Sequence, residues 1–290
     1  MFYGSIVALI TPFKNGQVDF DSIKKLVEWH ISEGTEGIVP CGSTGESYLL
    51  TPEEYQQVIE TCVKTASKRV PIIAGTGCIS TADTIKRTKQ AEKAGADAAL
   101  IVTSAYIKPS QNGLFDHYKT VSESTSLPII LYDMPGRTHV KLEDETIYKL
   151  AKLKNVVGFK DGTSILDRPI GNRINLDDDF TLLSGEDLTA VAYLAGGGNG
   201  VISVTANVAP KLCSQLQKAW KDQNLTLVNQ ITQKLHQLNK SMFIESNPCP
   251  VKYAVSKLGK CHNELRSPLS PISKESEMIV DKAMQVAGII

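Results

Sequence analysis

One lysine stands out among the residues whose type and position could do chemistry. Lys160 ends the segment NVVGFK, where it follows apolar or small side chains on an expected interior strand. Apolar surroundings disfavour an ammonium and lower the pKa of a lysine from about 10.4 towards 7–8. A neutral amine is the form that attacks a carbonyl to give an imine. Lys160 is therefore a candidate Schiff-base nucleophile, and the alternative is a buried lysine paired with Asp161 or Glu46.

Other reactive side chains lie near the ends of neighbouring expected strands. Tyr132 ends PIILY, and its phenol is suited to move protons between carbinolamine, imine and enamine, although a lone strand-end tyrosine usually only packs. The glycines of Gly42-Ser43-Thr44-Gly45 let backbone N–H groups approach an anion, and two hydroxyls add donors; a plain tight turn is the alternative. Arg137 lies just beyond Tyr132, where a guanidinium could bind a carboxylate, although an isolated loop arginine is more often only solvated.

Several further motifs do not indicate a cofactor. The glycine-rich run 196–200 precedes a strand rather than a helix, so it is expected to be a turn and not a phosphate site. Gly75-Thr76-Gly77 lacks the dinucleotide-binding spacing. The five histidines and six cysteines have no metal-ligand spacing, and Cys41 is expected only to pack near the site. A metal-dependent aldolase is therefore disfavoured.

Short apolar runs that alternate with amphipathic stretches must position these residues. Near-continuous apolar runs are typical of parallel strands that are covered on both faces. Helix start signals at Asp19, Thr51-Pro52 and Ser80 lie between the runs. Eight strand–helix alternations predict an α/β fold of the (β/α)8 TIM-barrel type, and an open doubly wound sheet fits less well. The expected strands are Ser5–Ile10, Gly37–Val39, Pro71–Gly75, Ala98–Val102, Pro128–Tyr132, Val156–Lys160, Phe180–Ser184 and Gly200–Ser203.

The alternation stops near residue 224. Helical periodicity continues over Leu225–Phe243, Val251–Leu258 and Lys274–Ala287, with proline-containing loops between them. We therefore expect a catalytic barrel over residues 1–224 and a small helical C-terminal segment over residues 225–290. No linker composition separates the two parts, so the C-terminal segment should pack on the barrel.

Composition excludes several classes of protein. The 290 residues are 42% hydrophobic and 21% charged, as is usual for a globular chain. With 31 basic and 31 acidic residues the net charge is zero, which argues against nucleic-acid binding. No apolar run is long enough to cross a membrane, and the N-terminus lacks the basic region of a signal peptide. Scattered cysteines in a chain this long indicate reduced thiols, and so a cytoplasmic location.

Nine stretches spread over almost the whole chain resemble the dihydrodipicolinate synthase (4-hydroxy-tetrahydrodipicolinate synthase) family of Schiff-base pyruvate aldolases. They are GSIVALITPF, GSTGES, IIAGTG, KPSQNGL, ILYDMPGRT, GFKDGT, LLSGED, NGVISVTANV and ESNPCPVK. The resemblance implies a lyase that condenses pyruvate with L-aspartate 4-semialdehyde in lysine and diaminopimelate biosynthesis. It also implies a homo-oligomer, a tetramer built as a dimer of dimers, that needs no cofactor.

The resemblance also implies catalytic roles for four residues. Lys160 matches the lysine that condenses with pyruvate. Tyr132 and Ser43 match two members of a proton relay. Tyr106 matches the third member, which reaches across a dimer interface into the neighbouring site.

Four more positions match substrate-binding residues of the family. Thr44 matches a group that holds the pyruvate carboxylate, and Arg137 matches the arginine that binds the carboxylate of the semialdehyde. Gly185 and Ile202 match backbone positions that line the pocket. Two alternatives remain: an N-acetylneuraminate or 2-keto-3-deoxy sugar acid lyase of the same superfamily, and a non-catalytic barrel. Arg137 favours the synthase over the sugar-acid lyases.

This sequence departs from the family pattern at a few places near the site. Ser43 stands where threonine is commoner, and Asp133 replaces a frequent asparagine. Lys160-Asp161-Gly162 replaces Lys-Glu-Ala. None of these changes removes a catalytic group.

The positions that match the family's lysine-binding regulatory site differ more strongly. They include Pro52, Tyr55 and Ile79, where feedback-sensitive members use polar side chains. An isoleucine cannot form hydrogen bonds with the polar groups of an amino acid. We therefore expect inhibition by lysine to be weak or absent.

Overall fold

Eight parallel strands form a single sheet in the computed structural model, which describes residues 2–290. The sheet closes into a barrel between its two edge strands, where Ile38 pairs with Ile72 and the Ile38 N–H donates to the Pro71 carbonyl at 3.0 Å. All eight expected strands are confirmed. In sheet order they are β4 (Gly37–Val39), β1 (Gly4–Ala8), β10 (Gly200–Ser203), β9 (Thr181–Ser184), β8 (Val156–Asp161), β7 (Ile129–Asp133), β6 (Ala98–Val102) and β5 (Ile73–Gly75).

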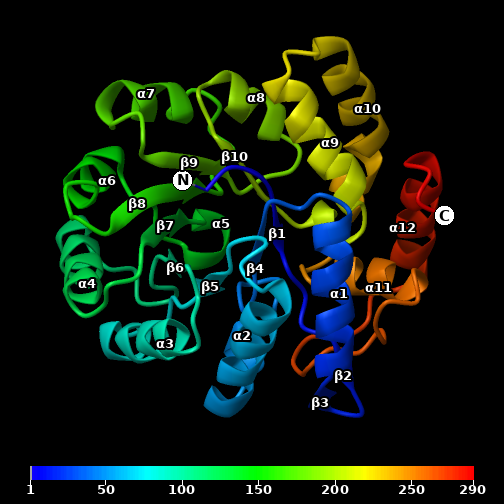
Figure 1. Cartoon of the computed structure of the whole chain (residues 1–290), viewed down its shortest axis with the longest axis horizontal. Coiled ribbons are helices and arrows are strands. Elements are labelled where there is room, and N and C mark those ends of the chain that lie inside the picture. Colours follow the sequence, from blue (N-terminus) through cyan, green and yellow to red (C-terminus); the bar gives the residue numbers. More distant parts are fainter. Residues whose placement is uncertain (1) are drawn as a thin grey trace.

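A ring of helices surrounds the strands (Figure 1). The expected start signals are confirmed, because the side chains of Asp19, Thr51 and Ser80 each accept a backbone N–H at the beginning of a helix. Thr51 and Glu54 form a complete capping box. The ring consists of α1 (Phe20–Ser32), α2 (Pro52–Ala66), α3 (Thr81–Lys93), α4 (Gln111–Glu123), α6 (Asp144–Leu150), α7 (Arg168–Asn175), α8 (Ala190–Ala195) and α9 (Pro210–Lys221).

Short helical turns lie in the loops between strands and helices. They are η1 (Ser47–Leu49), α5 (Pro135–Thr138) and η2 (Thr205–Asn207). The glycine-rich run 196–199 joins α8 to β10, as the sequence predicts. No helix within residues 2–290 is both long enough and apolar enough to cross a membrane.

Alternation along the strands separates two sets of side chains. One set packs under the helices and forms the main core, and the other fills the barrel interior with residues such as Ile6, Ile130 and Leu183. Tyr132 on β7 stands in register with Lys160 on β8, so both side chains lie on the same face of the sheet.

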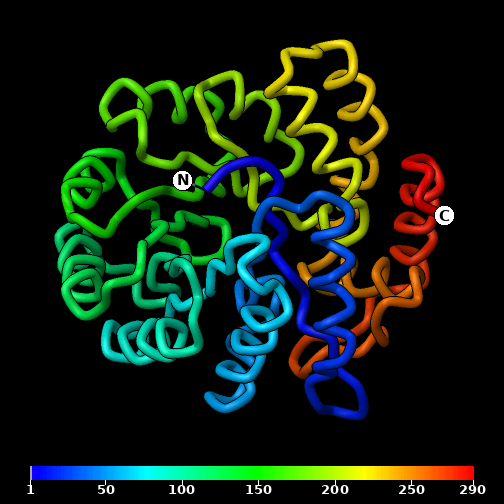
Figure 2. Tube along the Cα trace, viewed as in Figure 1, coloured from blue at the N-terminus to red at the C-terminus, as the bar shows by residue number. Residues whose placement is uncertain are grey.

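Three C-terminal helices lie along one side of the barrel (Figure 2). They are α10 (Leu225–Ser241), α11 (Cys249–Lys257) and α12 (Lys274–Val286), close to the expected ranges. Helix α10 packs against α9 and α12. The domain boundary at residue 224 stays a prediction.

A β-hairpin near the N-terminus was missing from the sequence-based expectation. Strands β2 (Phe13–Lys14) and β3 (Gln17–Val18) pair around Asn15-Gly16, where both residues have positive φ. Asn-Gly is a strong signal for a two-residue hairpin turn. The signal is therefore in the sequence, but the strands are too short to show alternation.

Candidate active site

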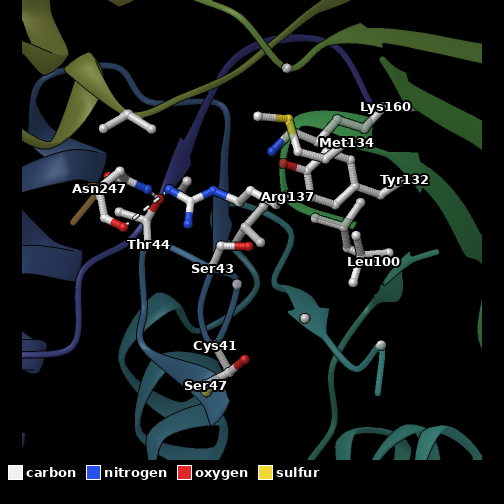
Figure 3. A pocket seen from close by; sticks show the side chains of 18 of the residues that line it. Cys41, Ser43, Thr44, Ser47, Leu100, Tyr132, Met134, Arg137, Lys160 and Asn247 are labelled. Carbon is white, nitrogen blue, oxygen red and sulfur yellow. Dashed lines mark hydrogen bonds between the residues drawn. The ribbon is translucent and has the colours of Figure 1, made fainter. Parts of the chain in front are cut away.

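A pocket opens at the carboxyl ends of the strands, where a barrel of this type carries its active site (Figure 3). Its empty volume, including the open mouth, is about 640 Å³. The lining residues are Ala8, Val39, Cys41, Gly42, Ser43, Thr44, Ser47, Tyr48, Gly75, Gly77, Leu100, Val102, Tyr132, Met134, Arg137, Lys160, Gly185, Glu186, Val204, Phe243 and Asn247.

Lys160 projects into this pocket from the end of β8. It is only 6% exposed, and its Nζ lies 4.1 Å from the centroid of the Tyr132 ring. The pKa of Lys160 is lowered to about 8 because burial lowers it more than the negative charges of Glu186 and Asp187 raise it. Arg137 lowers this pKa further. The amine is therefore partly neutral near physiological pH, as an imine-forming lysine requires.

The two carboxylates that could pair with Lys160 bind other cations. Asp161 contacts Arg168 at 3.4 Å, and Glu46 forms a buried ion pair with Lys252. Within residues 2–290, Lys160 forms no ion pair. The geometry therefore does not support the interpretation of Lys160 as a structural ion-pair residue.

Tyr132 shares the pocket wall with Lys160 and is 8% exposed. Burial raises the pKa of its phenol above the usual value of 10. The phenol therefore stays protonated at neutral pH, with its ring beside the amine. In this state it can donate a hydrogen bond to an oxygen bound at Lys160.

The loop after β4 is built from overlapping turns. The Gly45 N–H donates to the Gly42 carbonyl and the Glu46 N–H to the Ser43 carbonyl, both at 3.1 Å. The N–H groups of Ser43 and Thr44 donate to no acceptor among residues 2–290. Free N–H groups in consecutive turns form a concave site that suits an anion.

Asn247 joins this loop to Arg137, and the sequence analysis did not single it out. Its side-chain amide donates to Thr44 Oγ1 at 3.0 Å, and its carbonyl accepts from Arg137 Nη2 at 3.1 Å. In Figure 3 the Arg137 side chain extends towards Thr44 and Asn247, with Lys160 and Tyr132 on the other side of the pocket. The only signal in the sequence is the position of Asn247 within ESNPCPVK.

Glu186 is a second pocket residue that was not singled out. Burial, and then the neighbouring charge of Asp187, raises the pKa of Glu186 to about 7. Glu186 follows Gly185, which is close to the lysine: a Cβ added at Gly185 would lie 3.1 Å from Lys160 Cε. The glycine therefore leaves room for the lysine side chain.

Two of the proposed site residues do not line the pocket. Ile202 is 1% exposed and packs in the barrel interior, and Val204 lines the pocket instead. Tyr106 is 87% exposed, at the centre of a three-residue turn in which the Ile107 N–H donates to the Ala105 carbonyl at 2.8 Å. Its φ of +72° is unusual for a bulky residue and presents the aromatic ring to the outside of the chain.

Cys41 lines the pocket but offers no reactive thiolate. It is 1% exposed, and burial raises the pKa of its thiol well above the usual value. Residues 2–290 contain no group of three or more His, Cys, Asp or Glu side chains that could hold a metal ion.

Comparison with known proteins identifies the family of the chain. Residues 1–287 match the Dihydrodipicolinate synthetase family. The chain belongs to this family. Over 290 residues and the full length of both chains, it is 52% identical to a 4-hydroxy-tetrahydrodipicolinate synthase from Parvibaculum lavamentivorans. It is 49% identical, again over both full lengths, to the enzyme of that name from Rhodospirillum centenum.

Solved structures in the dihydrodipicolinate synthetase family have the same fold. The chloride-inhibited dihydrodipicolinate synthase from Acinetobacter baumannii, solved in complex with pyruvate, aligns with a TM-score of 0.97. It is 44% identical, and the alignment covers 100% of each chain. The expected fold, family and enzymatic nature of the chain are therefore confirmed.

Proposed function

We propose that the pocket condenses pyruvate with L-aspartate 4-semialdehyde through a Schiff base on Lys160. The product is 4-hydroxy-tetrahydrodipicolinate, an intermediate of lysine and diaminopimelate synthesis. The observation that carries the proposal is the state of Lys160: a buried amine, without an ion-pair partner among the described residues, whose pKa is lowered to about 8. Family membership and the names of the relatives support the choice of substrates.

The reaction follows from the chemistry of an amine and a keto acid. Neutral Lys160 adds to C2 of pyruvate, and the carbinolamine loses water to give an imine. Loss of a methyl proton gives an enamine, whose carbon attacks the aldehyde of the second substrate. The amine of that substrate then displaces Lys160 by transimination, which closes the ring and frees the enzyme. One water is released overall.

Each substrate has groups in the pocket that fit it. We assign the pyruvate carboxylate to Thr44 and the free N–H groups of its loop, and the semialdehyde carboxylate to Arg137. We assign proton transfer to Tyr132 and Ser43. Gly185 makes room beside Lys160, and no role for Ile202 is needed.

Tyr106 completes the relay only if it comes from a second copy of the chain. Its 87% exposure and strained turn support this role, because the side chain has no place in the pocket of its own chain. We therefore propose a homo-oligomer with at least a dimeric unit, and a dimer of dimers as the full assembly. Six free cysteines support a reducing compartment such as the cytoplasm.

Borohydride trapping tests the Schiff base directly. With pyruvate, the chain should gain one reduced adduct on the peptide that contains Lys160, and Lys160→Ala should gain none while keeping its far-UV spectrum. If the wild-type chain gained no adduct, the proposal would be wrong. A coupled assay that compares the semialdehyde with N-acetylneuraminate and 2-keto-3-deoxy sugar acids decides between the synthase and the sugar-acid lyases.

Weak or absent inhibition by lysine also remains a proposal. Tyr55 is fully buried and its hydroxyl donates to the Gly75 carbonyl at 3.0 Å, so it is not available to a ligand. Ile79 is 48% exposed and offers no polar group. Half-inhibition of the synthase by lysine well below millimolar concentration would contradict this expectation.

A further inference from the structure

A buried arginine lies behind the two strands that carry Tyr132 and Lys160. Arg168 is the first residue of α7, and its side chain is 1% exposed. We propose that Arg168 is a positioning residue, which holds Tyr132 and Lys160 side by side by binding the carboxylate that follows each of them in sequence, Asp133 and Asp161. The proposal rests on the function given to the Lys160 amine above.

Every nitrogen of the Arg168 guanidinium has a partner. Nη1 lies 2.8 Å from Asp133 Oδ2 and 3.4 Å from Asp161 Oδ1. Nε lies 2.7 Å from Asp144 Oδ1, and Nη2 donates to the Leu142 carbonyl. A planar guanidinium holds several acceptors in fixed directions, so the group fixes the positions of these partners relative to one another.

Strand register links this cluster to the catalytic residues. Tyr132 is paired with Lys160, and the next pair along the strands is Asp133 with Asp161. Successive side chains on a strand point to opposite faces. The tyrosine and lysine therefore face the pocket while the two aspartates face outward to Arg168. A slip of β7 against β8 would disturb both faces together.

Further contacts fix the ends of the same two strands. Asp133 Oδ1 accepts the Leu142 N–H at 3.1 Å, and Asp161 Oδ1 accepts the Thr163 N–H at 2.9 Å. The Gly162 N–H donates to the Asp133 carbonyl at 2.9 Å. A Cβ added at Gly162 would lie 2.5 Å from the sulfur of Met134 and 2.9 Å from the Asp133 carbonyl oxygen. The close approach of the two strand ends at this point therefore needs a glycine.

Two of the departures from the family pattern noted in the sequence, at residue 133 and at residues 161–162, lie at this cluster. Asp133 stands where asparagine is frequent, and Asp161-Gly162 where Glu-Ala is usual. An asparagine would offer Arg168 an uncharged acceptor, and charge-assisted hydrogen bonds are stronger than neutral ones. In this chain Arg168 therefore contacts a carboxylate at the end of each of the two strands.

Replacement of Arg168 separates positioning from general stability. Arg168→Met should lower kcat about tenfold to a hundredfold with a smaller change in the pyruvate KM, because the amine and phenol lose their alignment. Arg168→Lys should fall between wild type and Arg168→Met, since an ammonium keeps the charge but lacks the planar array of donors. All assays are run well below the unfolding temperature of each variant.

A second measurement follows the amine without any substrate. Acetic anhydride labels neutral lysines, and the pH midpoint for labelling of Lys160 reports its pKa. Loosened strand ends admit water, so Arg168→Met should move this midpoint upward from about 8. Because this measurement does not need pyruvate, it tests the role of Arg168 even if the wild-type chain forms no pyruvate adduct, which would refute the proposed function alone.

Arg173 provides a matched control on the same helix. Its guanidinium donates to the Gly197 and Phe180 carbonyls and to the Asn199 side chain, at the opposite ends of the strands. Arg173→Met should lower stability but leave kcat and the labelling midpoint unchanged. The inference is overturned if Arg168→Met keeps the wild-type kcat and midpoint, or if Arg173→Met reproduces both changes.

Discussion

At the scale of single residues, the reactivity of Lys160 results from a balance of opposing effects. Burial lowers its pKa most strongly, Glu186 and Asp187 raise it, and Arg137 lowers it again. With a pKa of about 8, about one amine in ten is neutral at pH 7. The three charged side chains therefore tune how much of the nucleophile is available.

Burial of Lys160 has a cost in stability that its replacement should remove. The pKa is about 8 in the folded chain and 10.5 for the free side chain, so the unfolded chain binds more protons between these values. The free energy of unfolding therefore rises with pH from about 8 to 10.5, and below pH 8 the full penalty applies, about 3 kcal/mol. Lys160→Met should be inactive but more stable than wild type at pH 7.

Urea unfolding at pH 7 and at pH 10 measures this difference, which should shrink at the higher pH. Lys89→Met on the exposed face of α3 is the control, and should leave the free energy of unfolding nearly unchanged at both pH values. A Lys160→Met variant less stable than wild type at pH 7 would show that the lysine stem contributes more by packing than its charge costs.

Two charge-removing substitutions should shift the Lys160 pKa in opposite directions. Glu186 has a pKa of about 7, so it is mostly ionised when Lys160 titrates. Glu186→Gln removes a negative charge and should move the pH midpoint for labelling of Lys160 below 8, whereas Arg137→Gln removes a positive charge and should move it above 8. A shift of both variants in the same direction would contradict this account.

At the scale of elements, α11 supports the loop that carries Ser43 and Thr44. Lys252 of α11 is fully buried; its ammonium pairs with Glu46 and donates to the Thr11 carbonyl at 2.8 Å. Glu46 also accepts the Arg266 N–H at 3.2 Å. The C-terminal segment is therefore bound to the pocket loop by buried charged groups. Removing one of them would leave its partner charge buried without compensation, which is costly in free energy.

Breaking this ion pair should destabilise the chain strongly. Lys252→Met leaves the Glu46 carboxylate buried without its cation, and the expected loss is about 3–5 kcal/mol in the free energy of unfolding. The double variant Glu46→Gln with Lys252→Met should lose less, because no unpaired charge remains. Urea unfolding of the two single variants and the double variant gives the coupling energy of the pair. If the losses in free energy of the single variants simply add up to the loss of the double variant, the ion pair does not contribute as proposed.

Sequence patterns predict strands and strand ends better than they predict which side chains contact one another in the fold. The eight strands follow from local apolar runs, and Lys160 and Tyr132 reach the pocket because strand ends converge in a barrel. Asn247 and Arg168 do not follow from any local pattern. Asn247 reaches Thr44 only through the packing of the C-terminal helices, and Arg168, on helix α7, contacts carboxylates on the two strands β7 and β8.

At the scale of the whole molecule, exposure of Tyr106 gives a test of assembly. If Tyr106 serves the pocket of a second copy, an inactive Lys160→Ala chain still supplies an intact tyrosine to a Tyr106→Phe partner. Equal amounts of the two variants, unfolded and refolded together, should recover about a quarter of the wild-type activity, from the one intact site in each mixed dimer.

Refolding each variant alone is the control and should give the low activity of that variant. If the mixture is no more active than the average of its components, Tyr106 acts within its own chain or not at all. Native mass spectrometry of the same samples shows whether mixed assemblies have formed, because the two variant chains differ in mass.

The pocket wall includes a residue from late in the chain, Asn247, and its loop is held by Lys252. Ribosomes release a protein from its N-terminal end, so the strands and their helices emerge well before these two residues do. A growing chain can therefore assemble its barrel around an unfinished pocket. The hydrogen bonds of Asn247 to Thr44 and Arg137 form only after residue 247 has emerged, so the side chains assigned to the two carboxylates are the last parts of the pocket to be fixed.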